Sequence, residues 1–368
     1  MEFDDPDEAA HFGDVVLSLA EYCMDAEREI YRKERALGLL PPSDFKLLHP
    51  QLQPRLDQQR LAAKVNQEFF NLVIDPFHQN LHSRFQQLSP FNEQQQQQQQ
   101  RVYSSPASMA KARSTLHQIS REWSSQGRAE REQCFGRITQ KLQELLPEGA
   151  QVAVPGCGLG RLCVDIASLG FRVEGSEFSY QMLLCGDCIM NRLPAERQVY
   201  PWIDQASNLP NSNNVYVPVR FPDMEITPQI LSRVHIVAGE FTRIYLGDAS
   251  AKHKFDCVLF CYFLDTCSNL CDYLRVLQHM VKPGGVVISF GPLQWHFQPS
   301  HGGLGGEDED LRFSQSVELT FAEVQHLFTE FGFRTEFHES VYSCGYARNP
   351  DSMFQVNYQC EFFVARRV

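Results

Sequence analysis

After Gly149 the chain alternates short apolar runs with helical stretches, and this pattern constrains the fold more than any other feature. The apolar runs cover residues 151–154, 171–175, 234–238, 255–260, 285–290, 335–341 and 358–365. Helical or long connecting segments separate the first five runs, which is typical of a parallel sheet built from βαβ units. Only a short loop separates the last two, which predicts an antiparallel pair. We therefore expect an α/β fold, a doubly wound Rossmann-like sheet of seven strands with an antiparallel C-terminal pair.

The N-terminal part of the chain has the apolar spacing of helices instead. Apolar residues recur at helical intervals over residues 8–37 and again over 53–74. Pro41 and Pro42 are expected to end the first of these helices, and Pro76 the second, because proline cannot continue a helix. An N-terminal helical region is therefore predicted to precede the sheet.

Two further helices are predicted directly before the sheet. Ser104 or Ser105, followed by Pro106, has the cap and first-turn pattern of a helix start. The second helix is expected at about 129–146, and the Pro-Glu-Gly sequence at 147–149 ends it.

Seven consecutive glutamines occupy residues 94–100, inside a segment that cannot bury enough apolar surface to order itself. We interpret this segment as a flexible Gln-rich linker between two domains. The expected parts are the N-terminal helical region (1–104) with its linker (93–104), and the sheet domain (105–368) with lead-in helices (105–148) and an insertion (about 193–231).

A glycine-rich turn joins the first predicted strand to the helix that follows it. Gly156, Gly158 and Gly160 alternate in this turn, and glycine lets the backbone turn sharply and approach a ligand closely. The following helix contributes N–H groups and the positive end of its dipole. A nicotinamide or flavin dinucleotide site would need glycine at position 161, where the chain has Arg161, so the turn disfavours that class of site. A tight turn that binds nothing is the other alternative.

Two more features favour a class I S-adenosylmethionine-dependent methyltransferase. Glu177 lies just past the second predicted strand, where a carboxylate can accept hydrogen bonds from both ribose hydroxyls. The segment 281–291, VKPGGVVISFG, has the turn and apolar run that usually lead into the fifth strand of this class. The antiparallel C-terminal pair is also typical of the class.

The charge of the chain limits its partners. Thirty-three basic and 45 acidic residues give a formal net charge of −12, and we find no basic block that would attract nucleic acid or an anionic membrane. The first ten residues are acidic where a secretory signal is basic, and no apolar run is long enough to span a membrane. Twelve scattered cysteines favour reduced thiols in the cytoplasm, with the nucleus as a second compartment.

A set of short segments narrows the class further. They are 114–123 (STLHQISREW), 154–162 (VPGCGLGRL), 175–179 (GSEFS), 200–203 (YPWI), 221–223 (FPD), 238–241 (AGEF), 263–266 (FLDT) and 291–297 (GPLQWHF). With these segments the chain resembles the carnosine N-methyltransferase family, from about Ala9 to the C-terminus. A generic methyltransferase would share neither the first segment nor YPWI and FPD.

The resemblance implies S-adenosylmethionine as the cofactor. The implied cofactor-binding residues are Gln118, Arg121, Gly156, Glu177, Glu240, Phe241 and Cys257. Gln118 and Arg121 would reach the methionine end, Gly156 would support the cofactor from the turn, and Glu177 would hold the ribose. Glu240 and Phe241 would frame the adenine, although the family has Asp where this chain has Glu240. Cys257 would face the cofactor from the fourth strand.

The resemblance also implies methyl transfer to an imidazole nitrogen of carnosine, which gives anserine, or of a related histidine dipeptide. Asp265 and His296 would be catalytic, and together with Tyr358 they would bind this small-molecule substrate. An acid and a histidine can hold the N–H of one ring nitrogen and leave the lone pair of the other exposed.

Each of these three residues also has a structural interpretation. Asp265 could cap a helix at 269–280, His296 could be a core histidine, and Tyr358 could be an ordinary strand residue. The spacing of Cys185 and Cys188 suits zinc or redox chemistry, but no second pair accompanies them, so we expect no metal.

Some functional alternatives stay open on the sequence alone. The acceptor could be a protein histidine or another small amine, or the chain could be a catalytically silent cofactor-binding module. The glycine-rich and acidic segment 302–310 is interpreted as a solvated loop, with a flap over the site as the alternative. A homodimer is a further alternative.

Overall fold

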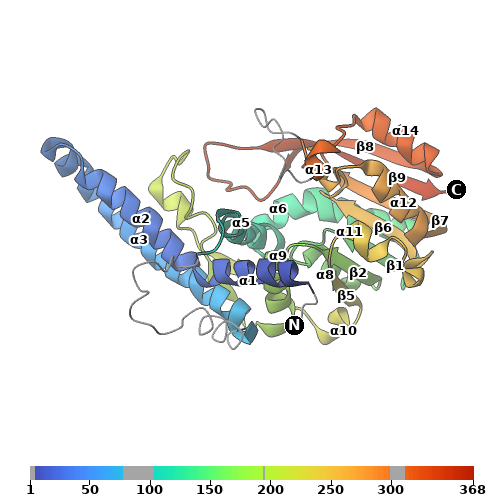
Figure 1. Ribbon diagram of the computed structural model, residues 1–368, viewed down its shortest axis with the longest axis horizontal. Coiled ribbons are helices and arrows are strands. Elements are labelled where there is room, and N and C mark those ends of the chain that lie inside the picture. The colour runs from blue at the N-terminus through green and yellow to red at the C-terminus, as the bar shows by residue number, and fades with distance from the viewer. Residues whose placement is uncertain (1–4, 78–102, 194, 299–310) are drawn as a thin grey trace. The chain divides into compact units, whose positions relative to one another are not determined.

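The computed structural model describes residues 5–77, 103–193, 195–298 and 311–368, and all structural statements below concern these residues. Contacts group them into two compact units (Figure 1). The helical unit comprises residues up to 126 together with 180–224 and 347–355. The sheet unit comprises residues 127–179, 225–346 and 356–368. Each unit is described by itself.

The sheet unit is built on seven strands in the order β5–β2–β1–β6–β7–β9–β8 (Figure 1). The strands are β1 (Gln151–Pro155), β2 (Arg172–Glu177), β5 (Val234–Ala238), β6 (Phe255–Cys261), β7 (Val281–Gly291), β8 (Phe333–Gly345) and β9 (Asn357–Arg367). The first five pair in parallel, and β9 lies antiparallel between β7 and β8. The predicted doubly wound sheet with an antiparallel C-terminal pair is confirmed.

The central strands of this sheet are buried on both faces. Along β6, Cys257 and Leu259 pack into one hydrophobic cluster, whereas Val258 and Phe260 pack into the cluster on the other face. Strands buried on both sides need apolar residues at nearly every position, which explains the continuous apolar runs of the sequence.

The helices of the sheet unit are α6 (Arg128–Arg131), the π-helical η3 (Glu132–Gly136), α7 (Arg137–Leu145), α8 (Arg161–Ser168), α10 (Pro228–Leu231), α11 (Phe241–Tyr245), α12 (Leu270–Met280), α13 (Leu311–Ser314) and α14 (Phe321–Glu330).

The helical unit contains the N-terminal helices and a small antiparallel pair of strands. Its elements are α1 (Pro6–Ala20), α2 (Tyr22–Gly38), α3 (Pro42–Ile74), α5 (Pro106–Trp123), α9 (Tyr180–Asp187), the π-helical η4 (Cys188–Arg192), β3 (Arg197–Val199) and β4 (Val219–Phe221). None of the helices that the structure describes has the length and apolar character needed to cross a membrane.

Two helix predictions are wrong. The single helix expected over 8–37 is broken at Glu21 into α1 and α2. The helix expected from residue 53 already begins at Pro42, because Pro50 and Pro54 lie inside α3 without ending it. The predicted helix start after Ser105 is confirmed, since the Ser105 side chain accepts from the N–H of Ser108 at 3.2 Å.

The expected domain boundary stays a prediction. Contacts group α5 with the N-terminal helices, whereas the sequence assigned it to the second domain as a lead-in helix. The glutamine run at 94–100 and the segment 302–310 lie outside the described residues, so their interpretations as a linker and as a loop or flap also stay predictions.

Asp14 on α1 anchors the start of α5 within the helical unit. Its carboxylate accepts from the Ser105 N–H at 2.7 Å and from the hydroxyls of Ser105 and Ser108, both at 2.6 Å. Although burial acts in the opposite direction, these hydrogen bonds lower the pKa of Asp14. A carboxyl group with a lowered pKa stabilises the fold above its unfolded-state pKa and loses that contribution as the pH falls.

We expect Asp14→Asn to lower the free energy of unfolding at neutral pH by about 1–3 kcal/mol, because hydrogen bonds to a charged acceptor are lost. Chemical denaturation between pH 7 and pH 3 measures this, and the difference from wild type should shrink below about pH 4. Glu68→Gln, a change at an exposed carboxylate on α3, is the control and should have no such effect. A loss that does not depend on pH would contradict the role of the charge.

Candidate active site

The glycine turn at the end of β1 can be formed only by small residues with unusual backbone angles. Gly156, Gly158 and Gly160 have φ values of 66°, 58° and 84°, in the left-handed region that favours glycine. A Cβ atom on Gly156 would lie 2.2 Å from a ring carbon of Phe263. Space and backbone conformation therefore both require glycine at this position.

Glu177, the last residue of β2, fixes its carboxylate against this turn. One oxygen, Oε2, accepts from the N–H of Gly158 at 2.9 Å. The other, Oε1, accepts from the N–H groups of Phe178 at 2.9 Å and Ser179 at 2.8 Å. The glycine turn and the carboxylate that the sequence predicted for the same ligand therefore lie together at the carboxyl edge of β1 and β2.

The predicted adenine residues follow β5 at the same edge. The N–H of Gly239 donates to the carbonyl of Glu177 at 2.9 Å, so the ends of β2 and β5 are adjacent. Glu240 caps α11 by accepting from the N–H groups of Thr242 and Arg243 at 3.0 and 3.1 Å. Glu240 has a longer side chain than the Asp found here in the family that the chain resembles. Its carboxylate is held by the N–H groups at the start of α11.

Phe241 and Cys257 are both buried. Phe241 makes edge-on contacts with Phe260, Phe263 and Tyr273 in the core. Cys257 is 0% exposed and lies near the amino end of β6, and burial raises the pKa of its thiol well above the ordinary value. Its predicted contact with a cofactor stays a prediction, and this placement away from the carboxyl edge does not favour it.

Gln118 and Arg121 lie on α5 in the helical unit, so their predicted contact with a ligand of the sheet unit stays a prediction. The side-chain oxygen of Gln118 is buried and has no hydrogen-bond partner among the described residues. A buried acceptor without a donor is costly, which makes it a candidate ligand contact. Arg121 is also buried, with its guanidinium 3.8 Å from the carboxylate of Glu122.

Asp265 lies in the short 3-10 segment η7 (Leu264–Thr266) that follows β6, and only 3% of its surface is exposed. Its Oδ2 accepts from the N–H of Gln294 at 2.7 Å. Burial raises the pKa of the Asp265 carboxyl, while the Gln294 N–H and the nearby His296 act against this rise. The cap of α12 is Asn269, which accepts from the N–H of Cys271, so the interpretation of Asp265 as that cap is wrong.

The segment after β7 places His296 beside Asp265. Trp295 is 4% exposed, and its indole N–H donates to the carbonyl of Leu319 at 3.0 Å. The residues on either side of this anchor, Gln294 and His296, are exposed. The backbone N–H of His296 donates to the backbone carbonyl of Asp265 at 3.0 Å. His296 is therefore at the surface of the site, and its interpretation as a core histidine is wrong.

Tyr358, the second residue of β9, joins the same group. Its hydroxyl donates to the side-chain oxygen of Gln294 at 2.9 Å, and whether it is more than an ordinary strand residue stays a prediction. Asp265, His296 and Tyr358 thus come together as predicted from the resemblance. Gln294 was missed, although its place two residues before His296 in the segment 291–297 was the available signal.

The described residues contain no cluster that would make an alternative metal centre. Among the described residues, no group of three or more His, Cys, Asp and Glu side chains could hold a metal ion. Both Cys185 and Cys188 are buried, which raises the pKa of each thiol.

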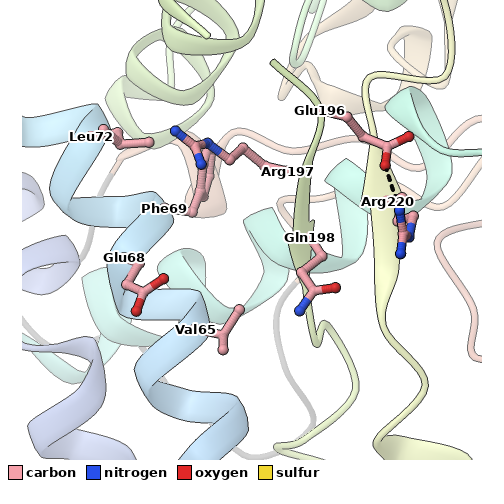
Figure 2. Close-up of a pocket in the computed structure, with 8 residues that line it drawn as sticks. All are labelled: Val65, Glu68, Phe69, Leu72, Glu196, Arg197, Gln198 and Arg220. Carbon is pink, nitrogen blue, oxygen red and sulfur yellow. Dashed lines mark hydrogen bonds and ion pairs between the residues drawn. The ribbon is translucent and has the colours of Figure 1, made fainter. Parts of the chain in front are cut away.

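A cavity of about 440 Å³ lies in the helical unit, and none of the predicted site residues lines it (Figure 2). Its lining comes from α3 and the β3–β4 region, namely Val65, Glu68, Phe69, Leu72, Glu196, Arg197, Gln198 and Arg220.

Comparison with known proteins identifies close relatives. Residues 98–368 match the family model described as carnosine N-methyltransferase. The chain is 32% identical to carnosine N-methyltransferase of Rattus norvegicus over 98% of this chain and 86% of the relative. It is 34% identical to the Schizosaccharomyces pombe enzyme of that name over 70% of this chain and 71% of the relative. Among solved structures, an S-adenosylmethionine-dependent methyltransferase of Methanosarcina mazei matches 62% of this chain and 97% of its own, with 11% identity and a TM-score of 0.39.

The buried charge of Asp265 leads to a prediction about stability. Because the pKa of Asp265 is raised in the folded protein, its neutral, protonated form favours the folded state at low pH. This contribution to the free energy of unfolding is lost as the pH rises through the folded-state pKa and the carboxyl group ionises. We therefore expect Asp265→Asn to melt at a higher temperature than wild type at pH 7, with the gap closing below about pH 4.

Calorimetry across this pH range measures the effect. Glu330→Gln, at an exposed carboxylate on α14, is the control and should melt within a degree or so of wild type at every pH. An Asp265→Asn variant that melts below wild type at pH 7 would mean that the Gln294 N–H and His296 outweigh the cost of burial.

Proposed function

The chain belongs to the carnosine N-methyltransferase family, and from this premise we propose that it methylates an imidazole nitrogen of carnosine to give anserine, or that of a related histidine dipeptide. S-adenosylmethionine is the proposed methyl donor. The observation that supports this function best is the group formed by Asp265, Gln294, His296 and Tyr358 at the carboxyl edge of the sheet. Doubly wound folds bind their ligands at this edge.

The residues present fit S-adenosylmethionine, which supplies an electrophilic methyl group on its sulfonium when bound. Gly156 has no side chain of its own, so the backbone of the turn can be approached by a ligand from the sides that the Phe263 ring does not cover. Glu177 holds a fixed carboxylate suited to ribose hydroxyls. The buried side-chain oxygen of Gln118 has no hydrogen-bond partner within the part of the chain that the structure describes, and an acceptor of this kind suits an ammonium group.

Asp265 selects the reactive form of the acceptor. A neutral imidazole has one nitrogen with a proton and one with a lone pair, and only the second can attack a methyl group. The carboxylate accepts the N–H of the first nitrogen and thereby fixes the tautomer. The ring becomes positive as the new N–C bond forms, and a buried carboxylate stabilises this charge more strongly than an exposed one.

His296 and Tyr358 complete the acceptor site. His296 is exposed beside Asp265 and can hydrogen-bond the same ring. Tyr358, whose hydroxyl is hydrogen-bonded to Gln294 in the same group, contributes its ring to the positioning of the acceptor. The enzyme mainly aligns the two reactants, since holding the reacting atoms at about 3–3.5 Å replaces a bimolecular encounter with an oriented one.

Incubation with labelled S-adenosylmethionine and a panel of acceptors tests the proposed function. We expect label in carnosine and in related histidine dipeptides, and none in anserine, because anserine already carries the methyl group. Label in histidine-containing proteins alone would favour a protein histidine as the acceptor. Saturable cofactor binding with no labelled acceptor would favour a silent binding module.

The role of Asp265 predicts a large loss of turnover in Asp265→Asn. Removal of a charge that stabilises the transition state is expected to lower kcat about 10²–10³-fold, with the affinity for S-adenosylmethionine unchanged. His296→Ala is expected to lower kcat as well. Initial rates and calorimetric titration of the cofactor separate the two effects. Unchanged turnover in both variants with cofactor binding intact would refute the assignment.

The glycine turn predicts that Gly156→Ala weakens the binding of the cofactor. A left-handed alanine costs about 1–3 kcal/mol, and its Cβ would also meet the Phe263 ring. We expect cofactor affinity to fall at least about tenfold in a calorimetric titration. Gly136→Ala is the control, because a Cβ there meets nothing within 4 Å. Equal affinity of the two variants would exclude the turn from the cofactor site.

A further inference from the structure

Gln294 makes a hydrogen bond to each of two residues that the proposed function assigns to the acceptor. Its backbone N–H donates to Oδ2 of Asp265 at 2.7 Å, and its side-chain oxygen accepts from the hydroxyl of Tyr358 at 2.9 Å. Asp265 follows β6 and Tyr358 begins β9, so the two groups come from different strands. Gln294 is the residue through which they are joined.

The backbone of Gln294 is held from both sides. Upstream, a Cβ on Gly291 would lie 3.2 Å from the Cα of Tyr262, so the chain leaves β7 in close contact with that backbone. Downstream, Trp295 is buried and its indole is hydrogen-bonded to Leu319. The N–H bond to Asp265 therefore depends on the backbone path and not on the side chain at position 294.

The side chain of Gln294 adds a second, separable function. Its oxygen is occupied by Tyr358, so its amide NH₂ is the remaining polar group. The side chain is exposed, and no acceptor among the described residues is hydrogen-bonded to this NH₂. A free amide donor beside Asp265 and His296 suits an oxygen of the acceptor molecule, and a histidine dipeptide carries a carboxylate close to its imidazole ring.

We propose that Gln294 is a positioning and specificity residue of this site. Its side-chain oxygen fixes the Tyr358 hydroxyl, and its side-chain NH₂ binds the carboxylate of a histidine dipeptide. This inference rests on the proposed function. It deepens that function, because it explains how the site distinguishes a dipeptide from an acceptor that has only an imidazole ring.

A double-mutant cycle between Gln294 and Tyr358 tests the positioning role. Gln294→Met removes both polar groups at nearly constant size and should lower kcat/KM for carnosine about tenfold. In a Tyr358→Phe background the same change should cost clearly less, because the hydroxyl it positions is already absent. If Gln294 had only a structural role, Gln294→Met would lower kcat/KM by the same factor in both backgrounds. Equal losses in the two backgrounds would overturn the positioning role.

Gln294→Glu separates the specificity role from the positioning role. The carboxylate can still accept from Tyr358 but cannot donate, and it repels the carboxylate of the dipeptide. We expect the KM for carnosine to rise about tenfold or more with kcat little changed. With β-alanylhistamine, which lacks the carboxylate, the same variant should keep the KM of wild type. A rise in KM of equal size for both acceptors would overturn the specificity role.

The control is Gln298→Met, a change at an exposed glutamine four residues further along the same segment, which should leave kcat/KM unchanged. The activity of the wild-type enzyme distinguishes the two levels of failure. A wild type that does not methylate carnosine refutes the proposed function and this inference with it. If the wild type methylates carnosine but the losses are additive, the positioning role of Gln294 is refuted and the proposed function is not.

Discussion

The burial of one carboxylate, that of Asp265, is the constraint on which the acceptor side of the site depends. An isolated charge taken out of water costs several kcal/mol, so it persists only where donors face it. Here the donor is the N–H of Gln294, and that bond requires the chain after β7 to pass directly over η7. The buried Trp295 keeps it on this path. Exposure of Gln294 and His296 then follows from their alternation with the buried residue.

The proposed cofactor side depends on a different constraint, the space available at the ends of β1 and β2. Gly156 leaves no room for a side chain beside Phe263, and Glu177 is tied to the turn through Gly158. Phe263 belongs to the segment that leads into Asp265. The two halves of the proposed site therefore share a backbone segment within the sheet unit.

The sequence predicted most of the sheet because strands buried on both faces leave continuous apolar runs. It failed where local signals conflict with tertiary packing. The apolar spacing indicated a helix only from about residue 53, whereas α3 begins at Pro42 and contains Pro50 and Pro54 in its first half. Gln294 could not be assigned from spacing, since its partners are 29 and 64 residues away. The burial of Cys257 agrees with its place in the apolar run 255–260, but its position toward the amino end of β6 does not favour the cofactor contact that the resemblance implied.

The antiparallel C-terminal pair explains why a residue near the end of the chain takes part in this site. In a purely parallel sheet every strand would bring its carboxyl end to the ligand edge. Because β9 runs against β7, with Gly291 opposite Glu361, its amino end reaches this edge. Tyr358 lies three residues beyond that last pair and opposite Cys344 of β8, so it extends past β7 to the segment that holds Gln294. The reversal of one strand therefore adds a side chain to the acceptor site that a βαβ unit could supply only from a loop.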